Sequence, residues 1–254
     1  MTRGLLIVGH GTRDEAGRAE FLSLTAQVAA RVPHVRVQSA FLELVEPSVE
    51  EGLRLLAAGG VQRVIVQPLL LFAAAHLKHD LPMALHAMGG GMQIELAPHL
   101  GCHPVLVRLS VERFVQAAGR AGAWEARPTL TILVGRGTSD AEGQAEFGRF
   151  VRLRREACPT EGFEHCFVAA AEPALEPTLL RACASSYRRV VVQPHLLFRG
   201  EVLHAVAEAV ERMRQAVPHQ EWLLVPHLGP DMKLAEMVAE LALRLQPHTA
   251  PLRS

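Results

Sequence analysis

In Leu5-Leu6-Ile7-Val8-Gly9-His10-Gly11-Thr12, four apolar residues run directly into a glycine-rich turn. A short apolar run that ends at glycine is typical of a buried parallel strand. Residues 15–31 follow with the spacing of an amphipathic helix. Strand, turn and helix in this order predict the first part of a βαβ unit.

The same stretch recurs 126 positions later as Val134-Gly135-Arg136-Gly137-Thr138. Three further blocks recur in the same order, two of them at an offset of 126 and one at 128. These blocks are Phe41 with Glu46-Pro47, Val66-Gln67-Pro68, and Pro98-His99-Leu100-Gly101. Because four ordered blocks share almost one spacing, the chain is predicted to be an internal duplication.

Each half contains four apolar runs that alternate with helical segments. In the first half we expect strands at 5–8, 36–42, 63–71 and 93–97, and helices at 15–31, 48–58, 80–88 and 104–118. In the second half we expect strands near 129–134, 163–168, 188–192 and 222–225, and helices near 141–156, 173–184, 201–216 and 231–245. This alternation predicts two tandem three-layer α/β domains, each with a mostly parallel four-stranded sheet. The small and polar residues 119–128 separate a first domain at 1–118 from a second at 129–254.

The composition excludes several classes of protein. With 254 residues, 49% of them hydrophobic, the chain is too apolar to be disordered. Its 26 basic and 26 acidic residues balance, so no net field attracts nucleic acid or an anionic membrane. We find no signal peptide, no run long enough to span a bilayer and no C-x-x-C spacing among the four cysteines. A cytoplasmic protein with reduced thiols and no nucleic-acid or membrane partner is expected.

The candidate site lies where the first three strands end. In open α/β sheets, ligands bind beyond the carboxyl ends of the strands. His10 follows the first expected strand, Glu43 lies at the end of the second, and His76 follows the third. Two imidazoles and a carboxylate at one edge can bind a metal ion or transfer protons.

The second half lacks all three of these groups. At the offset of 126, His10 corresponds to Arg136, and Glu43 and His76 correspond to Ala169 and Val202. The glycines and prolines of the turns persist while the polar groups are replaced. We therefore expect one site, in the first half, with the second half forming the opposite wall.

Four motifs together resemble the class II tetrapyrrole chelatases of the CbiX and SirB type. They are LLIVGHGTRDEAG at 5–17, FLELVEPSVEEGL at 41–53, VQPLLLFAAAHLKHDLP at 66–82 and PHLG at 98–101. The resemblance covers the whole chain, in the long two-domain form. It implies flavodoxin-like domains that face a cleft, and insertion of a divalent metal into sirohydrochlorin during cobalamin or siroheme synthesis. It also implies that His10 and His76 are catalytic and bind the metal, with Glu43 as a further ligand.

The residue types suit metal insertion, which requires removal of two pyrrole protons while a hydrated cation loses water. Neutral imidazole is both a base and a ligand for Co²⁺, Fe²⁺ and Ni²⁺, and an open site can release its metal. We expect Co²⁺ in preference to Fe²⁺ or Ni²⁺, with the metal as substrate and no tightly bound cofactor. The carboxylate arms of the macrocycle call for cationic partners, for which Arg13, Lys78 and Arg136 are the candidates and Arg199 is a further one. A monomer is expected, since the duplication supplies both walls of the cleft.

Two other functions fit parts of the pattern. A metal or tetrapyrrole carrier without catalysis could use the same histidines and carboxylate, and only turnover separates it from an enzyme. A phosphate enzyme is suggested by the glycine-rich loop, but no arginine directly precedes His10 and no P-loop lysine follows. His99 and His227 occur in both Pro-His-Leu-Gly motifs, which favours a structural role, whereas the sequence assigns no role to His195.

Overall fold

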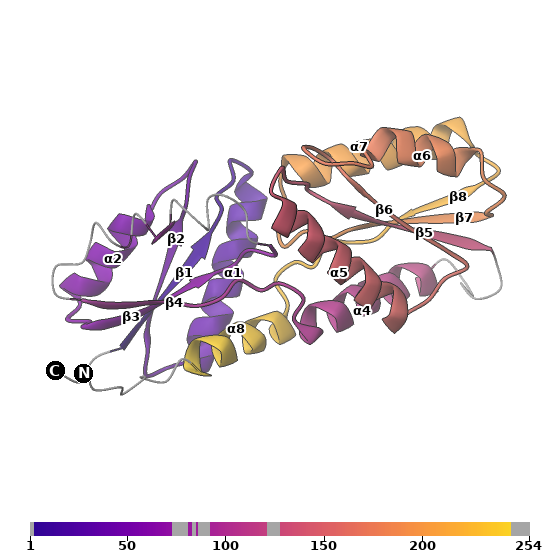
Figure 1. Ribbon diagram of the computed structural model, residues 1–254. Coiled ribbons are helices and arrows are strands. Elements are labelled where there is room, and N and C mark those ends of the chain that lie inside the picture. The colour runs from indigo at the N-terminus through magenta and orange to yellow at the C-terminus, as the bar shows by residue number, and fades with distance from the viewer. Residues whose placement is uncertain (1–2, 73–80, 83–84, 86–91, 121–127, 245–254) are drawn as a thin grey trace.

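The computed structural model describes residues 3–72, 81–82, 85, 92–120 and 128–244, and it contains two parallel sheets (Figure 1). The first sheet has the order β2-β1-β3-β4 and the second β6-β5-β7-β8, so the two halves have the same topology. The strands are β1 (Arg3–Gly9), β2 (Arg36–Phe41), β3 (Arg63–Pro68), β4 (Gln93–Leu96), β5 (Thr129–Gly135), β6 (Gly162–Phe167), β7 (Arg189–Pro194) and β8 (Glu221–Leu224). The predicted duplication of a four-stranded parallel sheet is confirmed.

Helices cover both faces of each sheet. The described helices are α1 (Glu15–Arg31), α2 (Val49–Ala58), α4 (Pro104–Arg120), α5 (Ala141–Ala157), α6 (Leu175–Cys183), α7 (Glu201–Ala216) and α8 (Met232–Arg244). On β1, Leu5 and Ile7 pack in the same core as Phe21 of α1, whereas Leu6 packs with Leu53 of α2 on the other face. This alternation produces the predicted three layers. The helix expected at 80–88 lies largely outside the described residues.

Expected and observed boundaries agree closely, with one strand clearly shorter than predicted. The apolar run 63–71 predicts a strand to residue 71, yet β3 ends at Pro68. The last paired residues of β3 are Pro68, which pairs with Val8 of β1, and Val66, which pairs with Leu96 of β4. Beyond Pro68 the Leu69 N–H still donates to the Val8 carbonyl at 2.8 Å, but the strand ladder ends there.

The last helix of each half packs against the other half. Figure 1 shows α8 beside α1 and α4 beside α5, and these helices are in contact. Leu234 and Val238 of α8 join the core cluster that contains Leu24 and Val28 of α1, while Phe114 of α4 packs with Val191 of β7. The two halves thus share a core. The predicted boundary at 119–128 lies mostly outside the described residues and stays a prediction.

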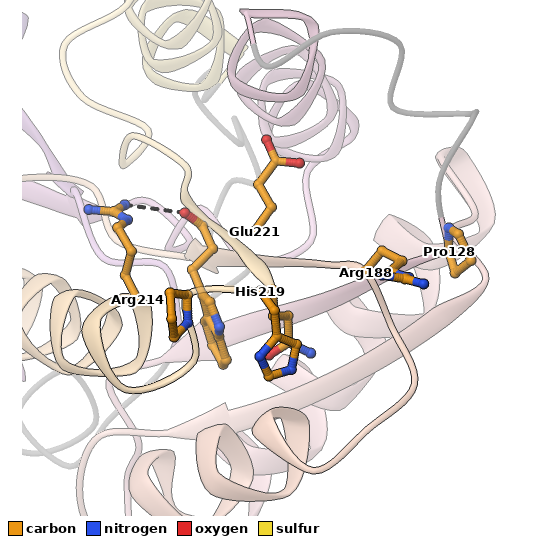
Figure 2. A pocket seen from close by; sticks show the side chains of 8 residues that line it. Pro128, Arg188, Arg214, His219 and Glu221 are labelled. Carbon is orange, nitrogen blue, oxygen red and sulfur yellow. Dashed lines mark hydrogen bonds between the residues drawn. The ribbon is translucent and has the colours of Figure 1, made fainter.

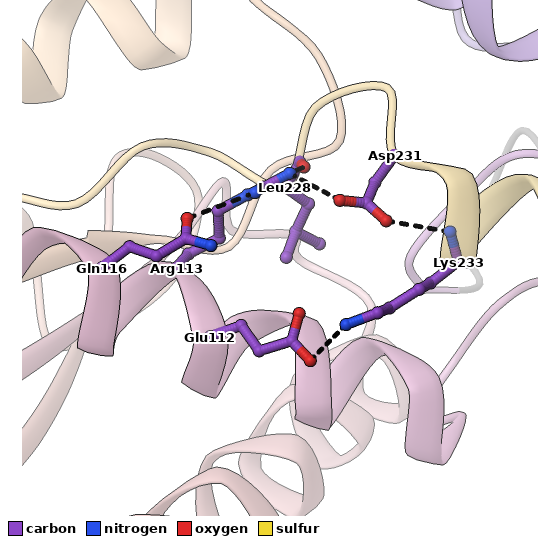
Figure 3. Close-up of polar contacts among 6 residues, drawn as sticks. All are labelled: Glu112, Arg113, Gln116, Leu228, Asp231 and Lys233. Carbon is purple, nitrogen blue, oxygen red and sulfur yellow. Dashed lines mark hydrogen bonds and ion pairs between the residues drawn. The ribbon is translucent and has the colours of Figure 1, made fainter.

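Polar contacts fix the place where the exchanged helices cross (Figure 3). The guanidinium of Arg113 on α4 donates to the Leu228 carbonyl and to Asp231 Oδ2, both at 3.0 Å. Lys233, at the start of α8, pairs with Glu112 of α4. These contacts join α4, the last helix of the first half, to residues 228–233, which lead into α8.

A buried polar cluster anchors α4 on the second sheet. Arg154 is fully buried and donates to Ser110 Oγ of α4 at 3.1 Å and to Gln193 Oε1 of β7 at 3.0 Å. Burial lowers the pKa of its guanidinium. Because a buried cation needs such partners, the cluster specifies the position of α4.

Within the described part of the chain, no helix combines the length and the apolar composition needed to cross a bilayer.

Candidate metal site

The candidate site lies at the carboxyl edge of the first sheet, at its topological switch point. Strand order reverses between β1 and β3, and in doubly wound sheets this is where ligands bind. His10 directly follows β1 at this point.

Two glycines bring the His10 loop against the end of β2. Gly11 has a φ of +106°, and a Cβ there would lie 1.9 Å from the Glu43 carbonyl oxygen. The Leu42 N–H donates to the Gly9 carbonyl at 2.9 Å, and the Glu43 N–H donates to the His10 carbonyl at 3.1 Å. The backbones of His10 and Glu43 are therefore held side by side, and no side chain fits between them.

The side chains of His10 and Glu43 are in contact. His10 Nε2 lies 3.1 Å from Glu43 Oε1, with the side chains 21% and 39% exposed. A carboxylate in this position orients the imidazole, and the partial exposure leaves room for a ligand.

The structure thus brings together two of the three expected metal ligands. The third, His76, lies outside the described residues, as does Lys78, so their positions stay predictions. Among the described residues, no group of three or more histidine, cysteine or acidic side chains is arranged to hold a metal. An open site that His76 would complete remains the prediction from the sequence.

A tight turn after β2 sets the direction of Glu43. Leu44 has a φ of +71°, and the peptide bond between Glu46 and Pro47 is cis. The Ser48 N–H donates to Glu46 Oε2 at 2.6 Å, and the Ser48 side chain caps α2. The sequence alone does not reveal the cis bond, although the recurrence of Glu-Pro in both halves is a signal for a special turn.

At the carboxyl edge of the second sheet, the loops have the same backbone conformation but lack the histidine and the carboxylate. The Ala169 N–H donates to the Arg136 carbonyl at 3.0 Å, Gly137 has a φ of +94°, and the bond between Glu172 and Pro173 is cis. Arg136 is exposed in the place of His10, and Ala169 carries no carboxylate. The loop architecture is duplicated, but the His–Glu pair is not.

The described arginines of the two edges are available to a ligand. Arg13, Arg136 and Arg199 are all exposed. Among the described residues, their guanidinium groups form no ion pair. Arg13 lies three residues after His10, on the same loop.

The two Pro-His-Leu-Gly histidines join the halves. His99 Nε2 lies 2.8 Å from Glu146 Oε2 on α5, and His227 Nε2 lies 2.9 Å from Glu20 Oε2 on α1. The two pairs are equivalent in the repeat. They agree with the structural role expected for this motif.

His195 is buried among aromatic side chains. It is 2% exposed, stacks on Phe150 with the ring centroids 3.8 Å apart, and has no hydrogen bond at either ring nitrogen to any residue that the structure describes. Burial lowers the pKa of its imidazole to about 3. The first half has Leu69 at this position, and an uncharged imidazole fills the same apolar space.

A cavity of about 800 Å³ lies elsewhere, at the amino ends of β7 and β8. Figure 2 shows its lining side chains, with Arg214 and Pro128 at opposite ends of the view and His219 between them. None of the expected site residues lines it. The site at the carboxyl edge is therefore distinct from this cavity.

Comparison with known proteins identifies the family. The CbiX family model matches this chain twice, at residues 4–117 and 130–245. A sirohydrochlorin ferrochelatase of Priestia megaterium is 27% identical over 238 residues, which cover 92% of this chain and 87% of the relative. A sirohydrochlorin cobaltochelatase of the same organism is 27% identical over 249 residues, covering 94% and 79%.

Solved structures agree on the fold. Bacillus subtilis SirB with Fe³⁺ aligns with a TM-score of 0.83 at 23% identity, covering 96% of this chain and 95% of SirB. SirB from Bacillus subtilis subspecies spizizenii in complex with cobalt aligns with a TM-score of 0.79 at 22% identity, covering 96% and 94%. The expected tandem chelatase-like α/β fold is confirmed. Since the family model matches nearly the whole of both halves, the chain belongs to the CbiX family.

Proposed function

We propose that this protein inserts a divalent metal ion into sirohydrochlorin at the carboxyl edge of its first sheet. The observation that carries the proposal is the contact of His10 Nε2 with Glu43 Oε1 at the switch point of the sheet. The relatives named as sirohydrochlorin ferrochelatase and cobaltochelatase, which align over most of this chain, support it.

In this proposal, His10 and His76 act as bases and as transient ligands of the metal substrate. A neutral imidazole accepts a pyrrole proton, and Glu43 stabilises the imidazolium that forms. While it is unprotonated, the same nitrogen can donate its lone pair to the incoming cation, and the Glu43 carboxylate can replace lost water as a ligand. The nitrogen accepts the pyrrole proton only after the metal has left it for the ring. Because the site is open, the metal can leave it for the macrocycle.

Co²⁺ is the metal that we propose. The two Priestia relatives have the same sequence identity to this chain, 27%, and one is named a ferrochelatase and the other a cobaltochelatase. Sequence similarity therefore does not show which metal this protein uses. Affinity for nitrogen ligands rises from Fe²⁺ through Co²⁺ to Ni²⁺, so two imidazoles alone do not select the metal. We propose Co²⁺ because the long two-domain form resembles the enzymes of the cobalt pathway.

The proposed contacts of the substrate come from both halves. Arg13 and Lys78 flank the His10 and His76 segments, and Arg136 takes the place of His10 at the second edge. Exposed guanidinium groups bind carboxylates through two parallel hydrogen bonds. These three residues would hold the carboxylate arms while His10 and His76 act on the centre of the ring.

The oligomeric state, the cofactor content and the location of the protein are also proposed. We propose a monomer that holds no resident cofactor and acts in the cytoplasm. The shared core of the two halves supports a monomer, since one chain supplies both edges. Four cysteines that form no disulfide support a reducing compartment.

A turnover assay tests the function. Purified protein is mixed with an excess of metal-free sirohydrochlorin and with Co²⁺, Fe²⁺ or Ni²⁺ in turn, and the absorbance of the metallated ring is followed. Many turnovers per protein, fastest with Co²⁺, are expected. A carrier would convert no more substrate than protein-free buffer does, and that result would reject the enzyme.

A further inference from the structure

The loop after β7 crosses to the first half and is fixed on α1. The Arg199 N–H donates to Glu20 Oε2 at 2.9 Å. The Arg199 carbonyl oxygen lies so close to Gly17 that a Cβ there would be only 2.2 Å away. Next to them, the rings of Phe198 and Phe21 pack edge to face with centroids 5.7 Å apart. Both backbone polar groups of Arg199 thus face the first two turns of α1.

This contact lies beside the His10 loop. A Cβ at Gly200 would be 3.4 Å from Thr12 Oγ1, and Thr12 is two residues after His10. A further contact joins His204 Nε2 of α7 to Asp14 Oδ2, the N-cap of α1, at 3.4 Å. The second half therefore places residue 199 at the edge that carries the His–Glu pair.

Glu20 holds the loop through one carboxylate oxygen. Its Oε2 contacts both the Arg199 N–H and His227 Nε2, each at 2.9 Å, and its side chain is 20% exposed. The equivalent Glu146 instead has both oxygens within 2.9 Å of His99 Nε2. Glu20 thus connects the Pro-His-Leu-Gly motif of the second half to the loop beside His10.

Arg199 combines a fixed backbone with an exposed side chain. Its guanidinium forms no ion pair with any residue that the structure describes, although the Arg199 backbone N–H donates to Glu20. An arginine whose main chain is held while its charge stays unpaired is suited to an anionic ligand, because little backbone order is lost on binding.

We propose that Arg199 is a specificity-determining residue that binds a carboxylate arm of the macrocycle at the first edge, and that Glu20 and Gly17 position it. This inference rests on the proposed function. It assigns to the second half a direct contribution to the catalytic edge, made through a loop that crosses the boundary between the halves.

Substrate binding without metal gives the first test. Arg199→Ala should weaken the binding of metal-free sirohydrochlorin about 10- to 100-fold, the range for loss of a hydrogen bond between charged groups. KM should rise by a similar factor while kcat stays close to that of the wild type, because the arm is held in ground and transition states alike. Arg199→Lys should recover part of the loss. Arg155→Ala, an exposed arginine in the last turn of α5, is the matched control and should change neither value.

A double-mutant cycle tests the positioning role. Glu20→Ala should raise KM in the wild type and have no further effect in the Arg199→Ala background, since it acts through Arg199. Glu146→Ala, which breaks the equivalent pair, should leave KM unchanged. Equal effects of Glu20→Ala in both backgrounds would show that Glu20 only stabilises the fold.

The outcomes separate this inference from the proposed function. If the wild type inserts metal and Arg199→Ala binds sirohydrochlorin as tightly as the wild type does, Arg199 is not part of the site. If the wild type binds the macrocycle without inserting metal and Arg199→Ala weakens that binding, the role of Arg199 stands and the enzyme assignment fails.

Discussion

Gly11 and Glu43 are in direct backbone contact, because a Cβ on Gly11 would lie 1.9 Å from the Glu43 carbonyl oxygen. This contact brings the loop after β1 against the loop after β2, and it allows His10 Nε2 to reach Glu43 Oε1 at 3.1 Å. The site is therefore built on a glycine, and its geometry can be tested separately from its chemistry.

Removal of the imidazole should abolish activity without unfolding the protein. His10→Ala should lower kcat about 10²- to 10⁴-fold, the range for loss of a positioned acid–base group. His10 is only partly buried, in a loop, so its thermal midpoint should stay near that of the wild type. The measurement is turnover with Co²⁺ together with a thermal melt.

Arg136→Ala is the matched control, since Arg136 occupies the equivalent loop of the second half. It should raise KM and spare kcat, as expected for a residue that binds the arms of the substrate. A loss of kcat equal to that of His10→Ala would mean that both edges perform the chemistry.

Substitution of Gly11 should separate loop geometry from stability. Gly11→Ala meets a backbone oxygen at a positive φ, so it should cost about 2 kcal/mol or more of folding free energy and should also move His10 from Glu43. Gly137→Ala is the same substitution in the second half, where the Cβ would lie 1.7 Å from the Ala169 carbonyl. Both variants should melt at lower temperatures, but only Gly11→Ala should lose kcat at temperatures where both are folded. Unchanged turnover in Gly11→Ala would contradict the geometry of the site.

Local patterns in the sequence predict the strands well and the exchange of helices not at all. The helix predicted at 15–31 from its amphipathic spacing has the boundaries of α1, and the structure adds that the Asp14 side chain caps its start. The pattern of α8 also marks an apolar face, but periodicity does not say which sheet that face covers. Only the packing shows that Leu234 and Val238 cover the first sheet.

For the candidate site too, the sequence predicts the residues at the strand ends but not the contacts between the halves. The ends of β1 and β2 placed His10 and Glu43 on one edge, because parallel strands end together. The contact of Arg199 with Glu20 depends on how the two halves face each other, and a repeat in the sequence carries no information about that orientation.

Buried His195 should make stability depend on pH. Its pKa is about 3 in the folded protein and near 6.5 in the unfolded chain, so the unfolded state alone takes up a proton between these values. Stability from this group is complete above about pH 6.5 and declines as the pH falls toward 3, by up to about 1.4 kcal/mol per pH unit.

His195→Leu copies the first-half residue Leu69 and removes this dependence. The variant should be more stable than the wild type, by a larger margin at pH 5 than at pH 8, in denaturant titrations. The control is His34→Gln, at an exposed histidine, which should not change the difference in stability between pH 5 and pH 8. A constant margin across this range would show that the pKa of His195 is the same in the folded and unfolded states, which would contradict its burial among aromatic side chains.

Transplanting the histidines to the second half should fail to rescue a defective first half. In the His10→Ala background, Arg136→His with Val202→His places imidazoles at the positions equivalent to His10 and His76, but Ala169 supplies no carboxylate. Addition of Ala169→Glu should restore a His–Glu contact, because the Ala169 N–H already donates to the residue-136 carbonyl as Glu43 donates to His10. We expect this last variant to bind Co²⁺ in absorbance titrations and still to insert far less of it than the wild type at limiting sirohydrochlorin, because Arg136 no longer holds a substrate arm and Ser139 stands at this edge where the first edge has Arg13. Turnover comparable with that of the wild type would mean that either edge can receive the macrocycle, and the assignment of one catalytic edge would then be wrong.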